Sequence, residues 1–170
     1  KVNVMIACWK RPTPYFSNLI DKKALQLNIS SIVKASPESI PYEAKASGLY
    51  IINHIAKKRA VNEGYDDALM LDYRGFIAEA TTSNFFMIKN KILYTPFTEC
   101  CLNGINRQEV IKIAKECNIQ VIEKHILPEE LSEADEAFLT GTAAEMNAIS
   151  SIEEYKFKNN PITQMLYSKF

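Results

Sequence analysis

The sequence predicts a single α+β domain in which short strands are flanked by amphipathic helices. Its 170 residues are 47% hydrophobic and 24% charged, which is typical of a globular domain with one core. Apolar residues recur at helical spacing in two segments, and short apolar runs bounded by turn residues lie between these segments. No repeat or low-complexity linker divides residues 1–170, so one domain is expected.

The first part of the chain is expected to contain two strands and a helix. Residues 1–8 and 25–33 are apolar enough for strands, and prolines between them indicate a loop. From about Ser47 to Asn62, apolar residues recur every three or four positions, which predicts a helix. Gly64 follows directly and is a typical helix stop.

The remaining elements follow from the same patterns. The middle is predicted to be a β-meander, with strands at 68–72, 76–80, 85–88 and 92–94 joined by short polar turns. The later elements are predicted as a helix at 106–117, a strand at 120–126, a short helix at 128–132, strands at 137–140 and 146–152, and a terminal helix from about Pro161.

Charge and cysteine content exclude several classes of function. The formal net charge is zero and no one-sided stripe of Lys or Arg is present, so no nucleic-acid partner is expected. The apolar stretches fall well short of the ~20 residues that cross a bilayer, so a cytoplasmic protein without a membrane partner is expected. The four cysteines lack C-x-x-C spacing and only two histidines accompany them, so no metal site is predicted.

Five segments together resemble the branched-chain amino acid aminotransferases, which are class IV pyridoxal 5'-phosphate enzymes of fold type IV. In chain order they read AKASGLY, GYDDALMLDYRGFIAEATTSNFF, LNGINRQEVIKIAKECNIQVIEK, PEELSEADEAFLTGTAAE and YKFKNNPITQML. The resemblance implies the large pseudo-barrel domain of the D-amino acid aminotransferase-like fold, a β-meander with packed helices. It also implies a homo-oligomer, a dimer or larger. From the same resemblance, the N-terminal small domain of the family is expected to be missing from residues 1–170, and residues 1–40 are expected to be the segment that leads in from it.

The same resemblance assigns two residues of the first helix region to the cofactor. Lys45 in A-K-A-S-G-L-Y matches the lysine that forms the Schiff base, and it lies just before a predicted helix N-terminus. The alternative is an ordinary solvated lysine. Tyr50 matches the tyrosine that hydrogen-bonds the phenolic oxygen of the cofactor, and its alternative role is packing in the core.

Glu79 matches the carboxylate that keeps the pyridine nitrogen protonated. It lies in the apolar stretch I-A-E-A, where a buried carboxylate needs a cationic partner, and a protonated ring nitrogen would be that partner. The alternative is a strand residue that faces outward. The family motif is commonly E-G-x-G-E-N, so Ala80, Thr82 and Ser83 are departures from it.

Two segments are expected to bind the phosphate and the substrate. In L-N-G-I-N-R, the resemblance assigns the backbone amides of Ile105 and Asn106, at the start of a helix, to the phosphate. In T-G-T-A-A-E, it assigns Thr142 to the phosphate and the amides of Ala143 and Ala144 to the substrate carboxylate.

The function that the resemblance implies is ping-pong transfer of the amino group of leucine, isoleucine or valine to 2-oxoglutarate through Lys45. The partners are then small amino acids and 2-oxo acids, and this chain without the small domain is expected to be weak or inactive. A D-amino acid aminotransferase, an aminodeoxychorismate lyase-like enzyme and a non-catalytic remnant are the alternatives.

Overall fold

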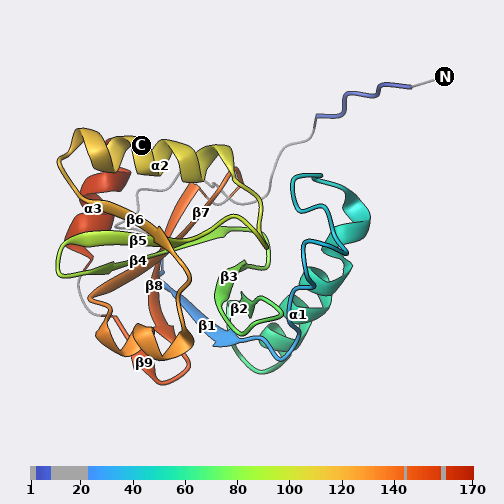
Figure 1. Cartoon of the computed structure of the whole chain (residues 1–170), viewed down its shortest axis with the longest axis horizontal. Helices are drawn as coiled ribbons and strands as arrows, with labels where there is room; N and C mark the ends of the chain where they lie inside the picture. Colours follow the sequence, from blue (N-terminus) through green and yellow to red (C-terminus); the bar gives the residue numbers. More distant parts are fainter. Residues whose placement is uncertain (1–2, 9–22, 144, 158–159) are drawn as a thin grey trace.

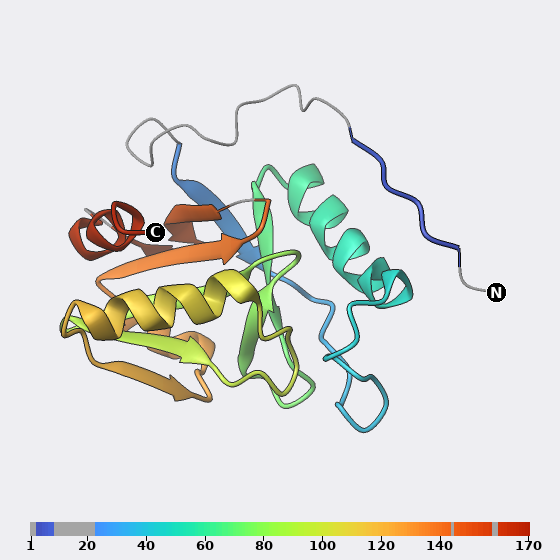
Figure 2. The same ribbon diagram turned by 90° about the horizontal axis from the view of Figure 1, so that it is seen from above.

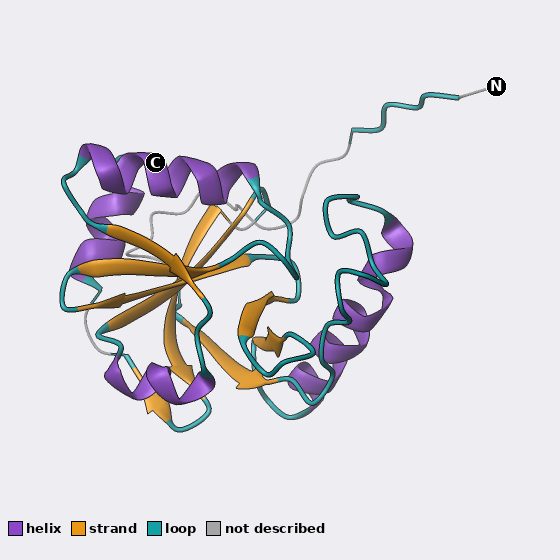
Figure 3. Cartoon of the chain, in the orientation of Figure 1, coloured by secondary structure: helices purple, strands orange, loops and turns teal. Residues whose placement is uncertain are grey.

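The computed structural model describes residues 3–8, 23–143, 145–157 and 160–170. These residues form a single mixed sheet with helices packed at both of its ends (Figure 1; Figure 3). The strands are β1 (Leu25–Ile29), β2 (Asp67–Leu71), β3 (Ile77–Ala80), β4 (Asn84–Lys89), β5 (Ile92–Pro96), β6 (Val121–Lys124), β7 (Glu136–Gly141), β8 (Glu145–Ile152) and β9 (Tyr155–Lys156). The helices are η2 (Ser47–Tyr50), α1 (Ile51–Asn62), α2 (Ile105–Glu116), η3 (Pro128–Glu133) and α3 (Pro161–Tyr167).

The strands lie in the order β3-β2-β1-β8-β7-β4-β5-β6, and β9 pairs with β8 outside this path. Three pairs are parallel, namely β1 with β2, β1 with β8, and β5 with β6. The predicted meander is therefore split into two hairpins, because β2–β3 and β4–β5 are separated in the sheet by β1, β8 and β7. The strand direction turns through a large angle across the sheet, which curls into a half-barrel (Figure 1).

Both faces of the central strands are buried. On β4, Phe85 and Met87 belong to one apolar cluster, while Phe86 and Ile88 belong to another on the opposite face. This division follows from the two-residue period of a strand. The second cluster includes apolar residues of α2 and α3, and the ring of Phe86 stacks on that of Phe138 with centroids 5.0 Å apart. Burial on two faces explains why the strand is continuously apolar instead of alternating.

Helix α1 covers the other end of the sheet. Ala56 and Ala60 pack on Ala68 and Met70 of β2, where small side chains allow the helix to approach the strand closely. Viewed from above, α1 lies across the sheet from α2 (Figure 2). After α1 the chain turns at Gly64, whose φ of +92° favours glycine. The predicted helix and its stop are confirmed, with the first turn formed as the 3-10 helix η2.

Helix α3 is held to the sheet by a buried acid. Glu136 at the start of β7 accepts hydrogen bonds from Ile162 N at 3.0 Å and from Thr163 N and Oγ1 at 2.8 Å. A carboxylate at this position satisfies amides in the first turn of the helix, which have no partner inside it. The side chain of Glu136 on β7 thereby fixes where α3 packs on the sheet.

The other predicted elements agree with the structure except at the N-terminus. The remaining predicted strands and helices occur within a few residues of their expected bounds, and β9 was not predicted. Residues 3–8 form no strand and lie away from the sheet, so the strand predicted at 1–8 is wrong for that part; residues 1–2 lie outside the described residues (Figure 1). The first strand of the sheet ends at Ile29, short of the predicted Val33. Within the described ranges, no helix is long and apolar enough to cross a membrane.

Candidate functional site

The candidate site is a cavity where several chain segments end close together. It encloses about 420 Å³, including the part that is open to solvent. It lies between the start of η2, the turn from β3 to β4, the N-terminus of α2 and the end of β7. The lining residues are Lys45, Tyr50, Glu79, Thr81, Thr82, Ser83, Asn84, Leu102, Gly104, Thr140, Gly141 and Thr142. Four of the predicted site residues, Lys45, Tyr50, Glu79 and Thr142, are thus brought together.

The other predicted residues have different positions. Ile105 and Asn106 are the first two residues of α2, directly after the lining residue Gly104. Ala143 is exposed and is not among the residues that line the cavity. Ala144 lies outside the described residues. The substrate-binding role of Ala143 and Ala144 therefore stays a prediction.

The N-terminus of α2 offers backbone donors to the cavity. Gly104 is the N-cap of this 12-residue helix, and its carbonyl accepts the hydrogen bond from Gln108 N at 3.1 Å. The first amides of a helix have no acceptor inside it, and the helix dipole makes this end attractive to an anion. Ile105 is 81% exposed, so its contribution here is its amide.

Two glycines let the walls of the cavity come close to the β3–β4 turn. A Cβ atom on Gly104 would lie 2.5 Å from Asn84 Oδ1. A Cβ on Gly141 would lie 3.1 Å from Ser83 Oγ and 3.3 Å from the carbonyl oxygen of Thr82. Larger residues at these two positions would push the walls apart. Backbone that comes this close to the turn, beside a helix N-terminus, suits an anion such as a phosphate group.

Lys45 is exposed and lines this cavity two residues before η2. Among the lining residues it carries the only amine. Tyr50 is half-buried at the end of η2, and burial followed by the charge of Glu79 raises the pKa of its phenol. The lysine and the tyrosine therefore both border the cavity from the segment that enters α1.

Glu79 is buried on β3, and its cationic partner is a residue that the sequence analysis missed. Lys34 Nζ pairs with Glu79 Oε1, and the two side chains are 3% and 10% exposed. Asn84 Nδ2 lies 3.4 Å from the other oxygen, Oε2. Burial is the strongest influence and raises the pKa of Glu79 above its usual value, although Lys34 and a backbone hydrogen bond from Leu102 act to lower it. Lys34 is therefore a cationic partner of Glu79 within the protein, and the expected pairing of Glu79 with a ring nitrogen stays a prediction.

A second, smaller pocket adjoins the cavity through Tyr50, Glu79 and Leu102. It encloses about 280 Å³ and is also lined by Lys34, Tyr42, Ala44, Leu49 and Asn53. Asn53 is buried in α1 and donates from Nδ2 to the carbonyl oxygen of Thr81 at 2.7 Å. This bond ties α1 to the β3–β4 turn, so the two sides of the site are linked directly.

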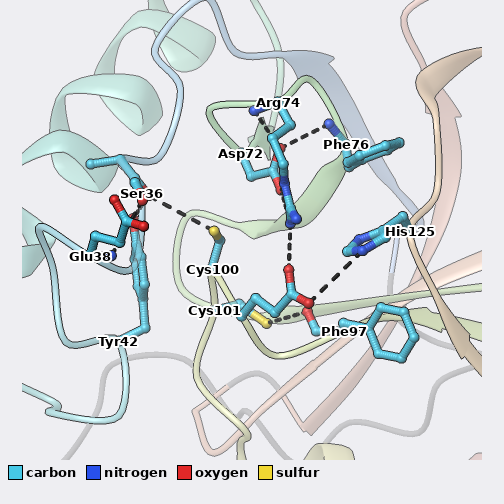
Figure 4. A network of polar contacts seen from close by, with 12 residues as sticks. Ser36, Glu38, Tyr42, Asp72, Arg74, Phe76, Phe97, Cys100, Cys101 and His125 are labelled. Atoms are coloured by element: carbon cyan, nitrogen blue, oxygen red, sulfur yellow. Dashed lines mark hydrogen bonds and ion pairs between the residues drawn. The ribbon is translucent and has the colours of Figure 1, made fainter.

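A polar network holds the loop after β5, which supplies Leu102 and Gly104 to the cavity. Asp72 accepts hydrogen bonds from Arg74 Nη2 at 2.7 Å and from Phe76 N at 3.1 Å. Arg74 Nη2 also donates to Glu99 Oε2 at 2.6 Å, which connects the β2–β3 turn to the loop (Figure 4). The ring of His125 stacks on Phe76 with centroids 4.8 Å apart.

Three further hydrogen bonds, from Asn84 and Arg107, hold that loop. The carbonyl oxygen of Leu102 accepts a hydrogen bond from Asn84 Nδ2 at 2.8 Å. The buried guanidinium of Arg107 donates to Asn103 Oδ1 and to the carbonyl oxygen of Pro96, each at 3.0 Å. The loop is therefore fastened on both sides of the point where it meets the cavity.

Fold and site together define a class of protein that has a cavity between a half-barrel sheet and a helix N-terminus. Residues 7–152 match the family described as amino-transferase class IV. The chain belongs to this family.

Named relatives are longer than this chain. A probable branched-chain-amino-acid aminotransferase of Rickettsia conorii is 44% identical over 132 residues, which cover 78% of this chain and 46% of that protein. A second relative is the T.th. branched-chain amino acid aminotransferase, whose crystal structure is of the complex with N-(5'-phosphopyridoxyl)-L-glutamate. It is 33% identical to this chain with a TM-score of 0.83. The match covers 86% of this chain and 50% of the T.th. chain. The chain spans about half the length of the curated relatives it matches.

A third relative strengthens the fold assignment. The structure of the branched-chain aminotransferase from Thermoproteus uzoniensis with norvaline is 35% identical to this chain, with a TM-score of 0.85. The match covers 91% of this chain and 52% of the Thermoproteus chain. The predicted α+β fold, with a pseudo-barrel sheet and packed helices, is therefore confirmed by both the half-barrel sheet of the chain and these structures.

Proposed function

We propose that this chain is the cofactor-binding part of a pyridoxal 5'-phosphate-dependent transaminase that moves the amino group of branched-chain amino acids to 2-oxoglutarate. The observation that carries the proposal is the cavity that gathers Lys45, Tyr50, Glu79 and Thr142 next to the first turn of α2. Support also comes from the phosphopyridoxyl group in the T.th. complex and from the names of the relatives.

The lining residues fit this cofactor chemically. The amides of Ile105 and Asn106, together with Thr142, would hold the phosphate at the edge where Gly104 and Gly141 leave room for it. Glu79 would accept a hydrogen bond from the protonated ring nitrogen, and Tyr50 would donate one to the phenolic oxygen. When bound, pyridoxal phosphate supplies an electron sink for the charge left on the substrate after its α proton is removed.

Lys45 would both attach the cofactor and move protons. Its Nζ is the amine that borders the cavity, and after displacement by the substrate amine it would take the α proton from the substrate. Ala143 and Ala144 would offer amides to the substrate carboxylate. The aliphatic side chain of leucine, isoleucine or valine is proposed because the relatives carry that name and one of the structures holds norvaline.

We also propose that residues 1–170 fold as one domain, with residues 1–40 leading into it, and that the complete protein is a homo-oligomer. The single sheet from β1 to β9 supports the first point, because β1 and β8 come from distant parts of the chain and pair directly. A non-catalytic domain remains the alternative from a different class. It predicts no cofactor band in the absorbance spectrum of the purified protein.

Borohydride reduction of the cofactor-loaded protein tests the assignment of Lys45. Reduction fixes the cofactor to its lysine, and peptide mapping should find the label on Lys45 and lose it in Lys45→Ala. A label on Lys34 or Lys23 instead would refute the assignment. Lys89→Ala is the matched control, since Lys89 pairs with Glu133 at the β4–β5 turn outside the cavity and the label should persist.

A transamination assay tests the reaction and its substrate. The complete polypeptide that contains this chain should transfer the amino group of L-leucine to 2-oxoglutarate, and D-alanine should be a poor donor. Residues 1–170 alone should be weak or inactive in the same assay. Preference for a D-amino acid would favour the D-amino acid aminotransferase alternative.

A further inference from the structure

Lys34 occupies an unusual position for a lysine. Its side chain is 3% exposed, and its ammonium lies 5.0 Å from the ring centroid of Tyr42. Its backbone is fixed to the sheet, because Lys34 N donates to the carbonyl oxygen of Leu71 at 2.8 Å and the residue forms an isolated parallel bridge with Asp72. The ammonium is therefore held in place by the fold and has little freedom to leave Glu79.

The two oxygens of Glu79 face different surroundings. Oε1 is paired with Lys34, which lines the smaller pocket and is not among the residues that line the larger cavity. Oε2 lies 3.4 Å from Asn84 Nδ2, and Asn84 lines the larger cavity. The carboxylate thus stands between the lysine on one side and the proposed cofactor site on the other.

Three other titratable groups close to this pair, Tyr42, Cys101 and Tyr50, are neutral near neutral pH. Burial raises the pKa of Tyr42 to about 12 and that of Cys101 to about 12, and the pKa of Tyr50 is also raised by burial. Arg107 acts on Cys101, but its own guanidinium is engaged by Glu123 and Pro96. Lys34 is consequently the cation in direct contact with Glu79.

We propose that Lys34 is a positioning residue that keeps Glu79 ionised and turns its second oxygen toward the ring nitrogen of the cofactor. A buried carboxylate that loses its cation tends to take up a proton, because the charged form is poorly solvated. A neutral Glu79 would present no negative charge to a protonated ring nitrogen. The orientation of Glu79 toward the ring nitrogen rests on the proposed function, whereas the effect of Lys34 on the ionisation of Glu79 does not.

The ionisation of Glu79 can be measured without cofactor. In the complete protein labelled with ¹³C at glutamate side-chain carboxyls, the signal lost in Glu79→Gln identifies Glu79. At pH 7 this signal should be that of a carboxylate in the unsubstituted protein and in Lys34→Arg, and that of a carboxylic acid in Lys34→Met. Lys34→Gln replaces Lys34→Met if the latter fails to fold. A protonated Glu79 in the unsubstituted protein, or an ionised one in Lys34→Met, would overturn the proposal.

The ring nitrogen gives a second readout in protein loaded with pyridoxal phosphate labelled with ¹⁵N in the ring. Its chemical shift should be that of a pyridinium in the unsubstituted protein and in Lys34→Arg, and should move toward neutral pyridine in Lys34→Met. Lys124→Met is the control, since Lys124 pairs with Glu130 away from the cavity and should leave the signal unchanged. A pyridinium shift that persists in Lys34→Met refutes the role of Lys34. If the unsubstituted protein binds no cofactor, the proposed function fails, and the carboxyl measurement still decides the effect of Lys34 on Glu79.

Discussion

Substitution of Gly104 by alanine should lower the free energy of unfolding by an amount that can be estimated from the structure. The backbone of Gly104 has φ −59° and ψ 146°, which any residue can adopt, so alanine adds no backbone strain there. That atom would lie 2.5 Å from Asn84 Oδ1, closer than the 3.0 Å below which real Cβ contacts essentially do not occur. The Asn84 amide therefore has to move by at least 0.5 Å, the difference between these two distances.

The cost of this movement can be estimated from the contacts of Asn84. Its Nδ2 donates to the carbonyl oxygen of Leu102 at 2.8 Å, and weakening that bond costs about 0.5–1.5 kcal/mol. Strain from an extra methyl in a packed site adds about 1–3 kcal/mol. We expect Gly104→Ala to lower the free energy of unfolding by about 2–4 kcal/mol. For a chain of this size, that corresponds to a fall in Tm of about 4–16 °C.

Thermal unfolding followed by circular dichroism measures the effect, and Gly48→Ala is the matched control. A Cβ on Gly48 meets nothing within 4 Å, so the Tm of this variant should be unchanged or slightly raised. The double variant Asn84→Ala with Gly104→Ala isolates the clash. In the Asn84→Ala background, Gly104→Ala should cost only about 0.5–1 kcal/mol, the difference between glycine and alanine at an N-cap. An equal cost in both backgrounds would show that the clash with Asn84 is not the cause.

Three further predictions concern other parts of the molecule. Glu79→Gln should still bind cofactor but slow proton transfer from leucine by several orders of magnitude, because an amide cannot keep the ring nitrogen protonated; stopped-flow spectra showing a near-normal rate would contradict this. Glu136→Ala should free the start of α3 and cost about 2–4 kcal/mol, since three hydrogen bonds are lost, and hydrogen exchange should accelerate mainly in that helix. A thiol reagent at pH 8 should modify exposed Cys8 quickly and leave Cys100 and Cys101 intact, because burial raises the pKa of these thiols to about 11 and about 12; equal reaction of all three would mean that the loop after β5 opens readily.

The elements that depend on local sequence were predictable. Helix α1 has regular apolar spacing and a stop at Gly64, and α2 follows the glycine at 104, so both occur close to their predicted bounds. The turn at Asn90 was also predictable, because Asn and Lys at its centre adopt positive φ between two apolar runs. These features are set by residues within a few positions of one another.

Features that depend on distant pairing were not predictable from one sequence. The hairpins β2–β3 and β4–β5 look locally like one meander, and only the insertion of β1, β8 and β7 between them separates the two. Lys34 was missed for a similar reason, since it meets Glu79 across 45 residues. Its apolar neighbours Ile32, Val33 and Ala35 were the one local signal, because a lysine inside such a run needs a buried partner.

The pairing of β1 with β8 can form only after a delay during synthesis, because β8 is made long after β1. Ile29 N donates to the side chain of Glu153, a residue 124 positions later in the chain. A ribosome that adds about 5–20 residues per second needs about 6–25 s to cover that distance. During this interval β1 leaves the ribosome before its neighbour β8 has been made. The nascent chain therefore carries an open, apolar strand edge at its centre, and binding of a chaperone to residues 25–29 would protect it until β8 arrives.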